Sequence, residues 1–240
     1  MCSPDLHNRD ERGYDGPMTT IAIVGAGKGL GAAVARKFGN EGHAVALISR
    51  NQGRLDALAT DLAAEGIQAR GFTADVRDPA SLAAALEQAT ETLGPIEVLQ
   101  YSPLPQKDFM RPVLETTPAD VRGPIEFSIY GPIAAVHQVV PGMRFLKDAT
   151  PSILFINGGT ALTPRTHLAG TSIAFAGQAA LLQMLHDELK EEGIHVAQLV
   201  IGGSIVAGDE QKDPAILADH VWDLHTKRDR LRIEVATDQP

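Results

Sequence analysis

Short runs of apolar residues alternate along the chain with longer stretches in which apolar residues recur every three or four positions. The apolar runs cover 21–24, 44–48, 69–74, 96–100, 153–156 and 196–201, and helical spacing occurs near 29–40, 51–65, 79–93, 118–145 and 171–192. Nearly continuous apolar runs are typical of strands that are buried on both faces. The pattern predicts an α/β fold, a doubly wound parallel sheet of the Rossmann type with helices on both faces.

The first 18 residues differ from this pattern. They are polar and contain two prolines and two glycines, so they predict a flexible arm over 1–18. The remaining residues, 19–240, show no internal repeat and no linker. A chain of 240 residues is long enough for one sizeable core. We therefore expect one domain over 19–240.

Charge and composition exclude several classes of protein. The formal net charge of −9 argues against nucleic acid or an anionic membrane as the main partner. No apolar run reaches the ~18 residues of a membrane span, and the N-terminus lacks the order of a signal peptide. Cys2 is the single cysteine, and the eight histidines lack metal-ligand spacing, so we expect neither an intrachain disulfide nor a metal site. These features predict a cytoplasmic protein.

A glycine-rich segment joins the first apolar run to the helical stretch after it. This glycine turn comprises Gly25, Ala26, Gly27, Lys28, Gly29, Leu30 and Gly31. Glycine lets the backbone turn tightly and approach a ligand closely, because no Cβ intervenes. The helix that follows presents unpaired N–H groups and the positive end of its dipole, which suits a pyrophosphate. The placement between strand and helix favours a nucleotide site over a purely structural turn.

Two cations occupy places where a nucleotide ribose is read, one inside this turn and one after the second apolar run. Ser49-Arg50-Asn51 comes directly after the second apolar run, where a carboxylate would hold the ribose 2′-hydroxyl of NAD. Arginine pairs instead with a 2′-phosphate, and Lys28 could add a second positive charge. The alternative is that both are solvated surface cations. We favour NADP(H) as cofactor. Asp75-Val76 could border the adenine, or Asp75 could simply end its strand.

Four motifs at matching spacings resemble those of the short-chain dehydrogenase/reductases over residues 20 to about 208. They are Gly25-x-x-x-Gly29-x-Gly31, Asp75-Val76, Gly131 before Pro141-Gly142-Met143, and Gln178-Ala179-Ala180-Leu181. The resemblance implies a seven-stranded parallel sheet, NAD(P) binding, and a homodimer or homotetramer. It also implies that Tyr101 and Ser102 border the cofactor, and that Gly203 and Ile205 meet its carboxamide. Val24 departs from the family's usual threonine.

The same resemblance shows that the family's catalytic positions have changed. That family uses Asn, Ser, Tyr and Lys, in which the tyrosine donates a proton and the lysine lowers its pKa. Registered on the last motif, Gln178 takes the lysine position and Ala174 the tyrosine position. Thr160 is the only hydroxyl near the serine position, and Ser128 takes that of the asparagine. No tyrosine lies within 160–192, so a small slip in register restores no Tyr–Lys pair.

Other residues could replace the missing acid. Tyr101 follows the fourth apolar run, where ligands of parallel sheets bind, although a tyrosine there could also simply pack. His167 lies in a loop before the last long helix and has a suitable intrinsic pKa, although a loop histidine is often only solvated. Thr160 could orient a carbonyl oxygen, or be an ordinary turn residue. Gln178 could bond a ribose, but it carries no charge to lower a neighbour's pKa.

Apolar residues surround the expected site. Pro103, Leu104, Pro105, Phe109, Met110 and Pro112 predict a stiff apolar lip. Such a wall fits a hydrophobic small-molecule substrate. We expect residues 214–229, with Trp222, to form a helical lid and a tail that faces a dimer partner, and Trp222 to lie in the core rather than against a ligand.

Three functions remain open from the sequence. The first is an atypical NADPH-dependent oxidoreductase that reduces a carbonyl, imine or activated alkene, with Thr160 and either Tyr101 or His167 polarising the acceptor. The second is an enzyme of the same fold that catalyses a cyclisation, isomerisation or elimination without redox chemistry. The third is a nucleotide-binding protein without catalysis.

Overall fold

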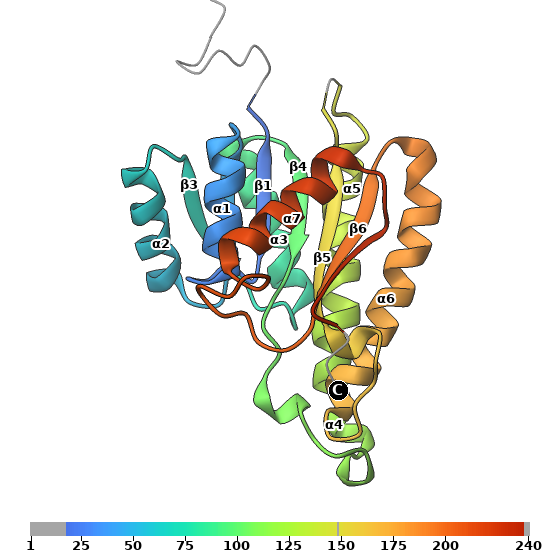
Figure 1. Ribbon diagram of the computed structural model, residues 1–240. Helices are drawn as coiled ribbons and strands as arrows, with labels where there is room; N and C mark the ends of the chain where they lie inside the picture. Colours follow the sequence, from blue (N-terminus) through green and yellow to red (C-terminus); the bar gives the residue numbers. More distant parts are fainter. Residues whose placement is uncertain (1–17, 148, 238–240) are drawn as a thin grey trace, which may run out of the picture.

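A seven-stranded parallel sheet forms the centre of the molecule (Figure 1). The computed structural model describes residues 18–147 and 149–237. The strands are β1 (Thr20–Val24), β2 (Ala44–Ser49), β3 (Ala69–Thr73), β4 (Ile96–Tyr101), β5 (Ser152–Gly158), β6 (His195–Ile201) and β7 (Arg232–Val235). Their order is β3-β2-β1-β4-β5-β6-β7, and every neighbouring pair is parallel. The predicted doubly wound sheet is therefore confirmed.

The described residues form seven α-helices. They are α1 (Leu30–Asn40), α2 (Gln52–Ala64), α3 (Pro79–Leu93), α4 (Pro118–Ile125), α5 (Gly131–Met143), α6 (Ala169–Leu189) and α7 (Pro214–Lys227). Six of them cover the two faces of the sheet, while α4 lies beyond one end of it (Figure 1). Side chains of α1, α2 and α7 share one hydrophobic core with the sheet, and those of α3, α5 and α6 share the other. Alternating side chains of β1 supply both cores: Ile21 and Ile23 point to the first, Ala22 and Val24 to the second. Because the strands are parallel, their carboxyl ends all lie at one edge of the sheet, between these two layers of helices.

Polar side chains cap the first turns of α2 and α3 and so determine where these helices begin. The Asn51 side chain accepts a hydrogen bond from the backbone N–H of Arg54 at 3.0 Å, and Asp78 accepts from those of Ala80 and Ser81 at 3.1 and 3.2 Å. Such caps satisfy N–H groups that the first helical turn leaves unpaired. The helical stretches expected near 51–65 and 79–93 are confirmed as α2 and α3.

The long helix expected over 118–145 is interrupted. Between α4 and α5 the chain forms a five-residue π turn, Glu126–Tyr130. Pro124 lies just before this turn and Pro132 just after it. Proline lacks the N–H that an α-helix needs, so two prolines in one helical stretch favour a local change of hydrogen-bond pattern.

The expected lid over 214–229 is wrong, although the segment is helical. Helix α7 lies flat against the same face of the sheet as α1, and Trp222 contacts the Phe38 ring edge-on at 4.9 Å between centroids. The expectation that Trp222 belongs to the core is confirmed. No described helix has the length and apolar character to cross a bilayer. The predicted arm lies outside the described residues except for Met18.

Candidate nucleotide-binding and active site

The glycine turn has the open geometry that a bound phosphate requires. No side chain caps α1, which begins at Leu30, and its first turn contains no acidic residue. Methyl groups built on Gly27 and Gly29 would meet no atom within 4 Å, whereas one on Gly31 would lie 3.1 Å from the Cα of Ala26. The two open glycines and the uncapped N–H groups leave space and donors for an anion. The chain's residues here fit a dinucleotide pyrophosphate.

Gly25 anchors this turn against the segment that follows β4. Its φ of +96° is accessible to glycine but rarely to other residues. A methyl group there would lie 2.5 Å from the backbone of Pro103. The neighbouring Ser102 donates its backbone N–H to the carbonyl of Val24 at 2.9 Å. Ser102 is therefore held beside the glycine turn, as expected for a residue that borders the cofactor.

Two exposed cations lie at the open turn, Lys28 within it and Arg50 directly after β2. Lys28 and Arg50 are both exposed, and neither forms an ion pair with any described residue. Ser49 ends β2 beside them. The side-chain oxygen of Asn51 is already used to cap α2. The two cations thus keep their charge available for an anionic ligand.

The residues after β3 form a turn at the same edge. The Asp75 carboxylate accepts a hydrogen bond from the backbone N–H of Arg77 at 3.0 Å, so it braces its own turn. Val76 is buried, and its carbonyl oxygen lies close to Gly131. Both readings of Asp75 remain compatible with this geometry, because one carboxylate oxygen suffices for the turn.

Tyr101 cannot serve as the proton donor, and this prediction is wrong. Its side chain is 2% exposed, and its hydroxyl donates to the backbone carbonyl of Phe127 at 2.5 Å. Burial raises the pKa of the phenol well above its ordinary value, and nearby Asp75 raises it further. A phenol that is buried and already donating does not reach a substrate.

The partner of Tyr101 explains why this tyrosine is there. Within the π turn, the N–H of Gly131 donates to the carbonyl of Glu126, and the next residue is Pro132, which has no N–H. The carbonyl of Phe127 therefore lacks a helical donor. An unpaired buried carbonyl is costly, and the Tyr101 hydroxyl satisfies it. Tyr101 is a positioning residue for the π turn.

Replacing Tyr101 with phenylalanine is expected to lower the free energy of unfolding by about 1–3 kcal/mol, because the Phe127 carbonyl loses its donor. Chemical denaturation measures this change. Tyr130 is the matched control, since its ring is 53% exposed and Y130F should change stability by less than about 0.5 kcal/mol. Equal stabilities for Y101F and the unmodified chain would contradict this role.

The remaining catalytic candidates lie around the N-terminal half of α6. Ser128 is buried within the π turn, and Thr160 is half-buried in the 3₁₀ turn Gly159–Ala161 that follows β5. Both turns contact α6. Ala174 and Gln178 are buried one helical turn apart on α6. The fold therefore brings the elements of Thr160, Ser128 and Gln178 together.

His167 is exposed on the loop that leads into α6. This loop is joined to the segment after β4 by two backbone hydrogen bonds. The N–H of Val113 donates to the carbonyl of Thr166 at 2.7 Å, and the N–H of Ala169 donates to that of Arg111 at 2.9 Å. The loop that carries His167 is therefore braced against the segment that follows β4.

Exposed apolar side chains line this edge, which we call the apolar rim. Its members come from the segments after β4 and β6 and are Leu104, Met110, Val113, Leu114, Ile205 and Val206. The expected lip is only partly correct, because Phe109 is 4% exposed and its ring contacts Phe127 edge-on at 5.5 Å. Phe109 therefore anchors the segment in the core and does not line the rim.

The segment after β6 adds a group that the sequence did not reveal. Gly203 has a φ of +72°, and a methyl group on it would lie 3.9 Å from the Nζ of Lys212. The Lys212 ammonium also lies 3.8 Å from the carboxylate of Asp209. Ile205 is partly exposed beside them. No sequence signal marked Lys212, because a lone lysine in a polar loop matches no motif.

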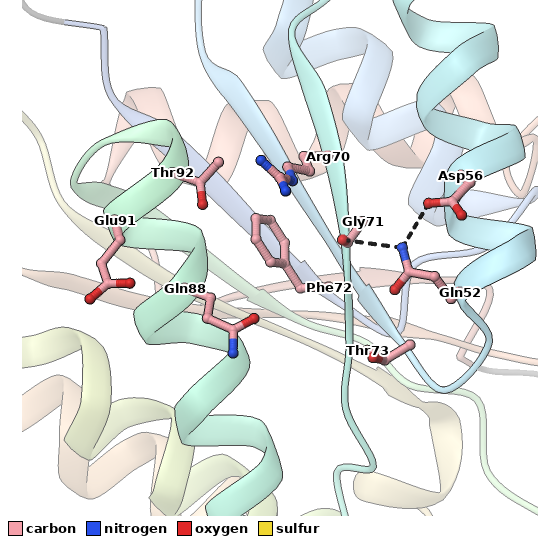
Figure 2. Close-up of a pocket in the computed structure, with 9 residues that line it drawn as sticks. All are labelled: Gln52, Asp56, Arg70, Gly71, Phe72, Thr73, Gln88, Glu91 and Thr92. Atoms are coloured by element: carbon pink, nitrogen blue, oxygen red, sulfur yellow. Dashed lines mark hydrogen bonds between the residues drawn. The ribbon is translucent and has the colours of Figure 1, made fainter.

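A separate pocket of about 370 Å³ lies at the outer edge of β3, between α2 and α3 (Figure 2). Polar groups dominate its wall. The Gln52 amide donates to Asp56 at 2.7 Å and to the carbonyl of Gly71 at 3.4 Å, and the guanidinium of Arg70 lies over the ring of Phe72. None of the predicted cofactor or catalytic residues lines this pocket, so it is distinct from the candidate site.

A protein-family model matches most of the chain, including the glycine turn. The family model described as short chain dehydrogenase matches residues 19–213. The chain belongs to the short-chain dehydrogenase family. The family resemblance drawn from the sequence motifs is confirmed.

Several family relatives resemble the chain at moderate identity. The 2,3-dihydro-2,3-dihydroxybenzoate dehydrogenase of Bacillus subtilis is 30% identical over 175 residues, which are 72% of this chain and 64% of that protein. Oxidoreductase UcpA of Escherichia coli K12 is 30% identical over 185 residues, 76% of this chain and 68% of UcpA. The 3-dehydrosphinganine reductase TSC10A of Arabidopsis thaliana is 26% identical over 193 residues, 79% and 57% respectively. The chain thus spans about three fifths of the length of the first and last of these relatives.

Solved structures share the fold. A short-chain oxidoreductase of Pseudomonas aeruginosa PAO1, described as containing an atypical catalytic center, superposes with a TM-score of 0.81 at 21% identity. The alignment covers 92% of this chain and 97% of that one, and an NADPH-bound structure of the same protein aligns equally well. A short-chain dehydrogenase of Rhodopseudomonas palustris has a TM-score of 0.77 at 26% identity and covers 92% and 98%.

Proposed function

We propose that the chain is an NADPH-dependent reductase with an atypical mechanism, acting on a carbonyl, imine or activated alkene of a hydrophobic small molecule. The observation that carries this proposal is the open, uncapped glycine turn, with the free cation Lys28 within it and the free cation Arg50 directly after β2. Family membership and the names of the relatives support oxidoreductase chemistry. The NADPH-bound Pseudomonas structure supports the choice of cofactor.

In this proposal, one group of residues at the sheet edge binds the adenosine half of the cofactor and a second group binds the nicotinamide half. The N–H groups at the start of α1 bind the pyrophosphate, and Lys28 and Arg50 bind the 2′-phosphate. Asp75 and Ser102 border the adenosine half, and Gln178, Gly203 and Ile205 the nicotinamide half. The chemistry supplied by bound NADPH is hydride transfer.

Proton transfer would not follow the family's usual route. Helix α6 contains neither tyrosine nor lysine, with Ala174 and Gln178 at the positions we assign to that pair. We propose that Thr160 orients the acceptor atom by donating its hydroxyl hydrogen bond, and that His167 supplies the proton. Ser128 takes the place of the relay asparagine. A substrate such as an imine, which can arrive protonated, needs least help from this site.

The apolar rim supports a hydrophobic small molecule as the substrate. Leu104 is 87% exposed and Leu114 98% exposed, so these side chains leave apolar area uncovered at the edge where a substrate would enter. Covering apolar area contributes roughly 25 cal/mol per Å². A hydrophobic or aromatic substrate gains this energy, whereas a sugar does not.

The reductase proposal predicts that purified protein oxidises NADPH with at least one member of a panel of apolar ketones, imines and enones. Replacing His167 with alanine should lower turnover at least about tenfold, because a positioned general acid contributes roughly 10²–10⁴. His220 on α7 is the matched control, since it is partly exposed on a helix outside the candidate site, and H220A should leave turnover unchanged. NADPH absorbance measures the rate. An unchanged rate for H167A would remove the histidine from the mechanism.

The composition of α6 also favours a second candidate. An active site without the tyrosine–lysine pair suits a cyclisation, isomerisation or elimination for which the bound nucleotide only shapes the pocket. Binding of NADPH without its oxidation, together with turnover of an apolar substrate, would support this enzyme. Binding without any turnover would support the third hypothesis, a nucleotide-binding protein without catalysis.

We propose a homodimer built on α5 and α6, or a homotetramer that contains this dimer. Both helices cover the same face of the sheet and expose apolar side chains, among them Ile133 on α5 and Ile173 and Met184 on α6. Light scattering coupled to gel filtration should give at least twice the monomer mass. The double variant I173D/M184D should fall to the monomer, because two buried charges cost several kcal/mol. A monomeric unmodified chain would contradict the proposal.

A further inference from the structure

Two histidines and a glutamate meet at the amino edge of the sheet, the edge opposite the glycine turn. His43 directly precedes β2, Glu97 is the second residue of β4, and His225 lies in the last turn of α7. One possible ligand atom from each residue lies within 4.8 Å of those of the other two. The three residues come from three elements that are far apart in the sequence and that the fold brings together.

The cluster is buried and incompletely satisfied. The side chains of His43 and Glu97 are 10% and 7% exposed, and His225 is 3% exposed. Neither ring nitrogen of His43 has a hydrogen-bond partner. Its Nε2 lies 3.5 Å from a Glu97 carboxylate oxygen, close enough for attraction but without hydrogen-bond geometry. A buried imidazole with both nitrogens free is costly unless something else bonds to it.

Neighbouring groups hold the other two side chains in place. The Glu97 carboxylate accepts from the hydroxyl of Thr19, and from the backbone N–H of Thr150 at 2.8 Å. The Ser152 hydroxyl bonds Nδ1 of His225 at 2.7 Å, and with the proton on Nδ1 this bond leaves the Nε2 lone pair for an ion. Hydrogen bonds of this kind orient the ligands in metal sites and fix the imidazole tautomer.

We propose that His43, Glu97 and His225 bind one Zn²⁺ ion. Two imidazoles and one carboxylate form a ligand set that zinc accepts, with water as a fourth ligand, whereas Mg²⁺ and Ca²⁺ prefer oxygen ligands alone. Tetrahedral bonds of about 2.0–2.1 Å place ligand atoms roughly 3.3 Å apart. The 3.5 Å between His43 and Glu97 is already near this value, and all three ligand atoms lie within 4.8 Å of one another.

A zinc ion there would join α7 to the start of two strands. His225 belongs to α7, and the other two ligands lie at β2 and β4. The site is structural, because the glycine turn lies at the other edge of the sheet. It is independent of the proposed reductase activity.

Trp222 makes the site observable in solution. It is the only tryptophan of the chain. Its ring lies 5.4 Å from that of His225 and 6.1 Å from that of His43, measured between centroids. An ion bound between the two histidines changes the surroundings of this single fluorophore.

The test uses the full chain with Cys2→Ser, so that no thiol competes, after removal of metals by chelation. Titration with ZnCl₂ alone, followed by calorimetry and by Trp222 fluorescence, should give one ion per chain with a Kd of about 1 μM or tighter. Saturating Zn²⁺ should raise the thermal midpoint by about 5–10 °C.

Single variants locate the ion. H43Q and H225Q should each weaken Zn²⁺ binding at least a hundredfold, whereas H195Q should leave it unchanged. His195 is a matched control, because it too is buried and begins β6 at the same edge, outside the cluster. Far-UV circular dichroism checks that each variant is folded. If H43Q or H225Q fails to fold, Co²⁺ absorption of the Cys2→Ser chain still reports whether histidine nitrogens ligate the ion.

Two results would overturn the proposal. One is stoichiometry well below one ion per chain with no change in Trp222 fluorescence, which would leave the cluster as a buried ion pair. The other is unchanged affinity in H43Q and H225Q, which would place the ion on surface histidines.

Discussion

Replacing Arg50 with alanine is expected to weaken NADPH binding about tenfold to a hundredfold, while the Kd for NADH changes less than about twofold. A hydrogen bond to a charged group contributes roughly 1.5–3 kcal/mol, and each 1.4 kcal/mol is about a factor of ten in Kd. Arg50 is exposed and has no ion-pair partner among the described residues, so no rearrangement offsets this loss. Titration of cofactor fluorescence measures both constants.

Arg54 provides the control for this experiment. It is also exposed, one turn into α2, and R54A removes the same charge without touching the expected ribose position. K28A should show a weaker loss for NADPH, because an ammonium offers no bidentate contact. Equal weakening of NADPH and NADH binding in R50A would contradict the 2′-phosphate role of this residue.

Replacing Gly131 with alanine is expected to lower the thermal midpoint by about 6–12 °C, the largest stability change among our predictions. A methyl group at this position would lie 2.4 Å from the Tyr101 hydroxyl and 2.6 Å from the carbonyl oxygen of Val76. Both are far inside contact distance, so the hydroxyl must leave the Phe127 carbonyl. Overpacking and a lost buried hydrogen bond together cost about 2–4 kcal/mol. Differential scanning calorimetry measures the change.

Gly142 is the matched control on the same helix. A methyl group there would meet nothing within 4 Å. Because alanine favours helix over glycine by up to about 1 kcal/mol, G142A should keep or raise the midpoint. A midpoint for G131A within 2 °C of the unmodified chain, or a fall of equal size in G142A, would be inconsistent with a close contact at Tyr101.

The sheet could be predicted from the sequence because its central strands are buried on both faces. Continuous apolar runs such as Ile21–Val24 indicate strands of this kind. The apolar pattern does not predict the last strand, β7, because this strand lies at the edge of the sheet and alternates Arg232 and Glu234 with apolar residues. The helical stretches near 51–65 and 79–93 were also predictable, and their first turns are held by Asn51 and Asp78, which bond neighbouring N–H groups.

The candidate site was only partly predictable, because its chemistry depends on which side chains face inward. Tyr101 follows a strand at the right edge, but its hydroxyl faces a carbonyl that Pro132 leaves without a donor. Both residues stand in the sequence, yet the link requires knowing that helix and strand touch. Phe109 was misplaced for the same reason.

The cluster of His43, Glu97 and His225 could not be predicted from the sequence at all. Metal motifs are recognised when ligands recur at short spacings, and these three are separated by most of the fold. Only the parallel topology, which brings the starts of β2 and β4 to one edge beneath the end of α7, places them together.

The segment after β4 is fixed at two points with a short stretch between them. Pro103 is pressed against Gly25 at one end. Phe109 is held at the other end, where Gly123 and Gly170 leave room for its ring and backbone. Residues 104–108 span these anchors and carry Leu104 of the apolar rim. Under the proposed function, we expect that a segment of equal length grafted over 104–108 alters substrate preference while the nucleotide half of the site keeps its shape.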